Sequence, residues 1–140
     1  MNSWFLLAVL LISTTSFAMA TSPYVGTWQL AEIIDAESNS KPLPEGKTFE
    51  ARIEEADEGV LRMAIKIGNN MRTKISLVGE GTPESQEIKM GGVMSTMMMP
   101  EASLFAVEKF LSKTFPTVTK MELDGDKLTL VGQGSVILSK

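Results

Sequence analysis

The chain of 140 residues contains neither cysteine nor histidine, and its 13 Lys and Arg against 17 Asp and Glu give a net charge of −4. The two missing residue types exclude thiol redox centres, the usual zinc sites and nucleophile–histidine pairs, which removes most hydrolase mechanisms. The negative charge disfavours nucleic acid or an anionic membrane as a partner. The sequence also lacks a phosphate-binding or dinucleotide-binding motif, and we therefore predict a non-enzymatic protein without a cofactor.

Residues 1–20 have the features of a secretory signal peptide. An apolar stretch from Trp4 to Ile12 leads to Ala18-Met19-Ala20, a typical cleavage site. That stretch is shorter than the roughly 20 residues that a membrane-spanning helix needs, which argues against a retained anchor. We expect cleavage after Ala20 and one domain over residues 21–140. Its location would be outside the cell, in the lumen of the secretory pathway, or in the periplasm of a bacterium.

Alternation of apolar and polar residues predicts β-strands before residue 90. Between Thr48 and Glu54, and again between Val60 and Ile67, every second residue is apolar, as in strands with one buried face. The turn Asp57-Glu58-Gly59 joins these two strands into a hairpin. Residues 35–46 are rich in turn formers and predict a loop. Further strands are expected over 24–34, 73–78 and 87–90.

One amphipathic helix is expected from about Pro100 to Lys113. Proline is favoured in a first helical turn, and lysine near the last turn suits the negative end of the helix dipole. At 100° per residue, Glu108 falls on the polar side of this helix. Phe105 also falls there, although an aromatic side chain has no obvious reason to be polar-facing. The stripe expected to face the core consists of Leu104, Val107, Phe110 and Leu111.

Three more strands follow the helix, over about 117–123, 127–131 and 135–138, separated by glycine-containing turns. The complete pattern is α+β, with seven or eight mainly antiparallel strands and the helix before the last three. So many strands in about 120 residues predict a curled sheet, either a barrel or a half-barrel. The helix is expected to lie against one opening or one face.

Half of the ten methionines lie between Met90 and Met99. Methionine fills irregular gaps in cores, so core or groove packing is one interpretation of this segment. A second is an apolar surface for a protein partner or a lipid. A third is Cu(I) binding, because Met90, Met94 and Met97 are spaced by four and three residues and thioethers are good Cu(I) ligands; we predict no metal site. The candidate partner surface consists of Met94, Met97, Met98, Met99 and Phe105.

From Gly91 onward the chain resembles the META domain family, which includes the bacterial heat-shock-associated envelope protein and the trypanosomatid META proteins. The motifs that match in order and spacing are Ser95-Thr96-Met97, Glu108 to Phe110, Asp124-Gly125-Asp126 and Leu128 to Leu130. Trp28-Gln29-Leu30 is similar to the first strand of the family. The resemblance implies a compact curled sheet with one helix, and a non-enzymatic role linked to the envelope, secretion or stress.

Many bacterial members of that family carry a cysteine pair that this chain lacks. The resemblance places Asn70 and Met99 near the positions of the two cysteines. It implies that packing by Met98 and Met99 replaces the disulfide, as in the cysteine-free, methionine-rich eukaryotic members.

The leading hypothesis is therefore an exported protein that binds an exposed apolar segment of another protein through the surface from Met90 to Phe105. The alternative is a calycin-like carrier that holds a small hydrophobic ligand inside the curled sheet. A filled interior around Trp28, Ile65, Leu77 and Leu128 would argue against the carrier. An open apolar pocket of several hundred Å³ would favour it.

Overall fold

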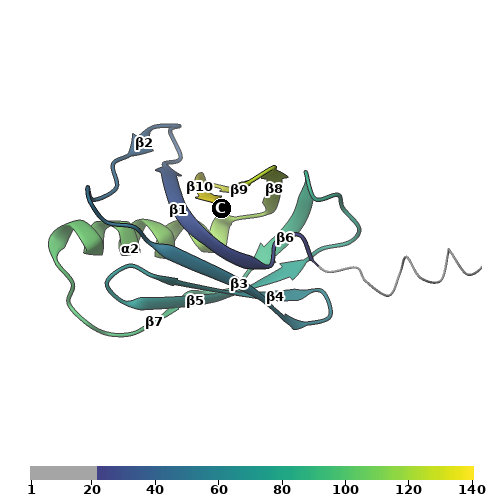
Figure 1. The fold of residues 1–140 in the computed structure, drawn as a ribbon, viewed down its shortest axis with the longest axis horizontal. Coiled ribbons are helices and arrows are strands. Elements are labelled where there is room, and N and C mark those ends of the chain that lie inside the picture. Colours follow the sequence, from purple (N-terminus) through teal and green to yellow (C-terminus); the bar gives the residue numbers. More distant parts are fainter. Residues whose placement is uncertain (1–21) are drawn as a thin grey trace, which may run out of the picture.

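The computed structural model describes residues 22–140 (Figure 1), so the signal peptide predicted for residues 1–20 lies outside the described part. No helix in residues 22–140 is long and apolar enough to cross a membrane. The elements, in chain order, are β1 (Gly26–Ile34), β2 (Ser40–Lys41), β3 (Glu50–Asp57), β4 (Val60–Lys66), β5 (Asn70–Leu77), β6 (Gln86–Met90), β7 (Met94–Ser95), α2 (Ala102–Thr114), the 3-10 helix η1 (Phe115–Thr117), β8 (Lys120–Asp124), β9 (Lys127–Gly132) and β10 (Gly134–Ser139).

The strands form a closed antiparallel barrel. Eight of them follow the order β10-β9-β8-β6-β5-β4-β3-β1, and β1 pairs again with β10, from Gln29 opposite Ser139 to Ile34 opposite Ser135. The short β2 adds to β1 and the short β7 adds to β5. This architecture confirms the predicted fold class, with one helix before the last three strands. Neither short strand was predicted. β2 lies in the segment expected to be a loop, and β7 lies between the strand expected over 87–90 and the expected helix.

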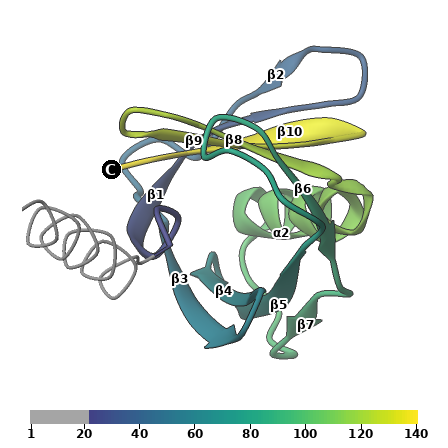
Figure 2. The same cartoon turned by 90° about the vertical axis from the view of Figure 1, so that its right-hand side faces the viewer.

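The helix lies between two parts of the barrel wall. Figure 2 shows α2 between the layer of β8, β9 and β10 and the layer of β3, β4 and β5. Val107 and Leu111 are buried, and Leu104 and Phe110 pack partly buried against the same core, which confirms the predicted stripe. Glu108 is a correction, since its side chain is buried among them instead of facing water.

Side chains fill the interior of the barrel. The period of two along β3 and β4 places Ala51, Ile53 and Met63 inward, each with at most 1% of its surface exposed. Trp28 is also buried, and its Nε1 donates a hydrogen bond of 3.0 Å to the Tyr24 carbonyl oxygen. A buried indole N–H needs an acceptor, and this bond supplies it. The Lys140 ammonium lies over the same ring, 4.6 Å from its centroid.

The core contact of the helix predicts a clear contrast between two substitutions. Leu111→Ala removes a side chain with no exposed surface, so we expect the free energy of unfolding to fall by about 2–5 kcal/mol. Phe105→Ala removes a side chain that is 46% exposed, so we expect a loss below about 1 kcal/mol. Urea denaturation measures both values. Equal losses for the two variants would contradict the helix orientation described here.

Candidate binding surface

Exposed apolar side chains gather at the start of the helix and in the segment before it. Of the six large hydrophobic residues that are exposed within residues 22–140, only Val78 lies elsewhere. Met97 is 96% exposed and Met99 is 91% exposed. We call this set the methionine surface, and its members are Met94, Met97, Met98, Met99 and Phe105. Core packing, one of the three interpretations of the sequence, is therefore wrong for these four methionines.

Met90 differs from the rest of its segment. It lies in β6 opposite Ile75 and is 5% exposed, so it belongs to the core. Met94 and Met97 extend into solvent instead. Burial of Met90 in the core and exposure of the other two side chains give no support to a shared Cu(I) site.

The backbone beneath the methionine surface is held by the side chain of Asn69. The Met98 N–H donates to Asn69 Oδ1 over 2.7 Å, and Asn69 Nδ2 donates to the Met98 carbonyl oxygen over 3.1 Å. This two-way pairing replaces the bonds that a neighbouring strand would make. Thr96 Oγ1 also donates to Asn69 Oδ1, and the Thr96 N–H donates to the Asn70 carbonyl oxygen. The segment is therefore attached at two successive points.

Glu108 of the helix completes this polar network. One of its carboxylate oxygens accepts from the backbone N–H groups of Gly68 and Asn69, over 2.9 and 2.6 Å, and the other accepts from Asn69 Nδ2 over 2.8 Å. The Asn69 amide thereby uses all four of its hydrogen-bonding positions. A buried carboxylate is costly unless donors surround it, and three donors meet this one.

Gly68 allows the turn to approach the helix this closely. A Cβ atom at this position would lie 2.4 Å from Pro100 Cβ and 3.0 Å from Glu108 Oε2. Only glycine leaves room for both neighbours without a shift of the backbone. The turn between β4 and β5 therefore meets α2 at Glu108 and meets Pro100 just before the helix. We call residues 94–99, which precede Pro100, the methionine segment.

The family resemblance implied that packing by Met98 and Met99 replaces a disulfide, and this expectation is wrong. Met98 and Met99 were expected to pack between the two segments, but Met98 is 59% exposed and Met99 is 91% exposed. Asn69 joins the same segments through hydrogen bonds instead. The link is polar and buried, while the apolar side chains point away from it.

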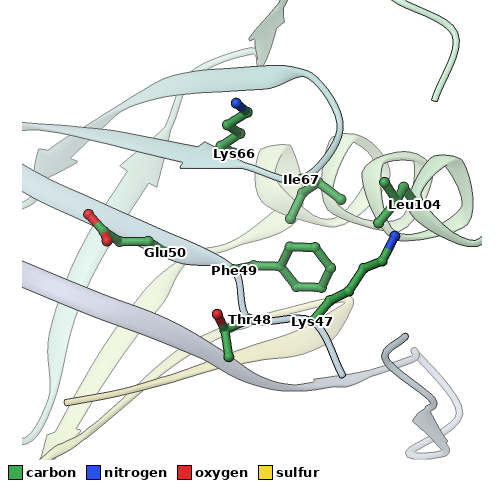
Figure 3. A pocket seen from close by; sticks show the side chains of 7 residues that line it. All are labelled: Lys47, Thr48, Phe49, Glu50, Lys66, Ile67 and Leu104. Carbon is green, nitrogen blue, oxygen red and sulfur yellow. The ribbon is translucent and has the colours of Figure 1, made fainter. Parts of the chain in front are cut away.

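Two surface hollows include residues of α2 in their lining. One of them has a volume of about 420 Å³. Figure 3 shows that Phe49, Ile67 and Leu104 turn toward one another in this hollow, with Lys47 beside them. The Lys47 ammonium forms an ion pair with Glu101 at the start of the helix. Thr48, Glu50 and Lys66 complete this lining. A smaller hollow of about 260 Å³ lies between α2 and the β1–β2 hairpin and is lined by Ile33, Lys41, Pro42, Ser103, Ala106, Val107 and Phe110.

The polar network predicts different roles for two adjacent asparagines. Asn69→Ala removes four hydrogen bonds and leaves buried partners unpaired, so we expect the free energy of unfolding to fall by about 2–4 kcal/mol. Asn70→Ala is the matched control, because the Asn70 side chain is exposed, and its effect should stay within about 0.5 kcal/mol. Thermal unfolding compares the two variants. A stable Asn69→Ala protein would show that the network is dispensable.

Comparison with known proteins agrees with this architecture. No curated protein matches the chain. The NMR structure of the protein from Burkholderia xenovorans has a similar fold, with a TM-score of 0.59, 12% sequence identity, and coverage of 86% of this chain and 92% of that one. At that identity the likeness concerns the fold alone. The model of the META domain matches residues 22–140, which is nearly all of the sequence beyond the predicted signal peptide. The chain therefore belongs to the META domain family.

Proposed function

We propose that this META domain protein is exported and binds an exposed apolar segment of another protein through the methionine surface. The observation that carries the proposal is the exposure of four methionine side chains in a segment whose backbone is held at Met98 by two partly buried hydrogen bonds to Asn69. A stress-linked or secretion-linked role is an extension that rests on the family resemblance.

The chemistry of the surface favours a protein segment as the partner. Methionine side chains are flexible and polarizable, so they adapt to apolar groups of different shapes. The backbone of Met98 is already fixed by Asn69, so binding need not order it again, and less entropy is lost. The expected partner is therefore an amphipathic or unfolded segment with several apolar side chains, recognised without a strict sequence.

The filled barrel supports this proposal over the calycin-like carrier. Trp28, Ile65 and Leu128 are at most 3% exposed, and Leu77 is packed against the same core. A carrier needs an apolar cavity where these side chains lie. A non-enzymatic role is supported by the carboxylate of Glu108. It is the one acidic side chain buried within residues 22–140, and its oxygens are already engaged by three donors.

A binding measurement tests the methionine surface directly. We expect a fluorescently labelled amphipathic peptide to bind the protein, and a peptide in which serine replaces its apolar residues to bind far more weakly. Combined Met94→Ser, Met97→Ser, Met98→Ser and Met99→Ser substitution should reduce the affinity about tenfold or more, since it removes the apolar contact. Fluorescence anisotropy gives the dissociation constants.

Val78→Ser is the matched control, because Val78 is exposed but lies outside the methionine surface. It should leave the affinity unchanged. All variants are first compared by thermal unfolding, so that only folded proteins enter the binding assay. Undiminished binding by the fourfold serine variant would refute the proposal.

Export predicts a defined N-terminus. If residues 1–20 are removed as a signal peptide, the protein purified from its natural source begins at Thr21. Intact-mass measurement, followed by sequencing of the N-terminal peptide, checks this. Retention of Trp4 to Ile12 in the purified protein would contradict the expected cleavage. The same mass spectrum, recorded under native conditions, would reveal a bound lipid if the protein were a carrier.

A further inference from the structure

We propose that Met94, Met97, Met98 and Met99 are a site of reversible oxidation, at which a hydroperoxide converts thioethers into sulfoxides while the fold stays intact. The modification would turn the methionine surface from apolar to polar. The inference about oxidation stands on exposure and chemistry. Its regulatory consequence rests on the proposed function.

The eight methionines within residues 22–140 fall into two groups. The four of the methionine surface are 59–96% exposed. The other four, Met63, Met71, Met90 and Met121, are at most 5% exposed. Oxidation of methionine follows access of the oxidant to sulfur, so the first group should react far earlier than the second.

Composition makes thioethers the main target in this chain. A cysteine thiolate would consume peroxide first, but the sequence contains no cysteine. The exposed thioethers are then the most accessible oxidisable groups. The same absence means that a thiol reductant leaves the protein itself unchanged, so a sulfoxide reductase can be tested without a side reaction.

The reaction balances with one hydroperoxide for each methionine. The sulfur lone pair attacks the terminal peroxide oxygen, an S–O bond forms and the O–O bond breaks. Sulfur loses two electrons, and the peroxide is reduced to an alcohol, or to water if hydrogen peroxide is the oxidant. The proton of the transferred oxygen passes to the leaving oxygen. The products are a neutral sulfoxide and a neutral hydroxyl compound.

The fold should tolerate this change because no sulfur atom holds the segment in place. The bonds that attach it use the Met98 backbone, the Thr96 backbone and hydroxyl group, and the Asn69 amide. The added oxygens would face solvent. Oxidation of a core methionine would instead force a polar group into an apolar space and destabilise the barrel.

The change matters for binding because a sulfoxide is polar. An apolar partner segment would lose its contact when the four side chains are oxidised, and would regain it when a reductase removes the oxygens. The exposure that admits peroxide also admits the reductase. The methionine surface would thus release its partner under oxidising conditions and recover it afterwards.

A peroxide time course tests the site without any partner. The purified protein is treated with hydrogen peroxide, and tandem mass spectrometry assigns the oxygens to individual methionines. We expect Met94, Met97, Met98 and Met99 to react at least about tenfold faster than Met63, Met71, Met90 and Met121. Circular dichroism and the thermal midpoint should stay unchanged when only the first four are oxidised. Similar rates for both groups, or unfolding at that stage, would overturn the inference.

A second arm tests the consequence for binding. Peroxide should weaken the amphipathic peptide's affinity for the wild-type protein about tenfold, and methionine sulfoxide reductase with dithiothreitol should restore it. The variant with leucine at Met94, Met97, Met98 and Met99 keeps an apolar surface, and its affinity should not respond to peroxide. An equal response of that variant would place the sensitive group elsewhere and overturn the switch. If the untreated protein failed to bind, the proposed function would fall, while the oxidation rates would still decide the modification site.

Discussion

The hydrogen bonds between Glu108 and Asn69 are the interaction on which the local arrangement depends. A carboxylate withdrawn from water is stable only where donors replace the lost hydration, and the turn between β4 and β5 supplies three of them. The side-chain amide of Asn69 in turn holds the backbone of Met98 through two hydrogen bonds. The helix, the turn and the methionine segment therefore form one unit. The backbone of the segment is thus held by polar contacts, which do not involve the exposed methionine side chains.

Much of the fold could be predicted from periodicity alone. Alternation along β3 and β4 identified the buried faces, because a sheet with one wet side needs a period of two. The helix and its core stripe followed from spacing as well. Glu108 was assigned to the polar side, although at 100° per residue it lies only about 40° from Leu104 and about 60° from Leu111, at the edge of the apolar stripe. Its burial depends on donors about forty residues earlier in the chain, and no local pattern reveals them.

The methionine segment was the part that sequence could not resolve. A thioether is compatible with a core, a surface or a soft-metal site, and the composition of the segment favoured core or groove packing. The outcome is set by β7, whose pairing of Met94 with Arg72 places the segment along the edge of β5. Asn69 then fixes the following residues. Neither the short strand nor the asparagine has a sequence signal stronger than that of an ordinary turn.

The pairing of β1 with β10 has a consequence for the order in which the barrel can fold. Gln29 and Ser139 are neighbours in the sheet although almost the whole domain separates them along the chain. The seam cannot form until β10 has been synthesised, and such distant contacts slow folding. Until then β1 is paired with β3 but lacks its partner on the other side, so the barrel stays open at this seam. Pairing of β10 with β1 is therefore the step that closes the barrel.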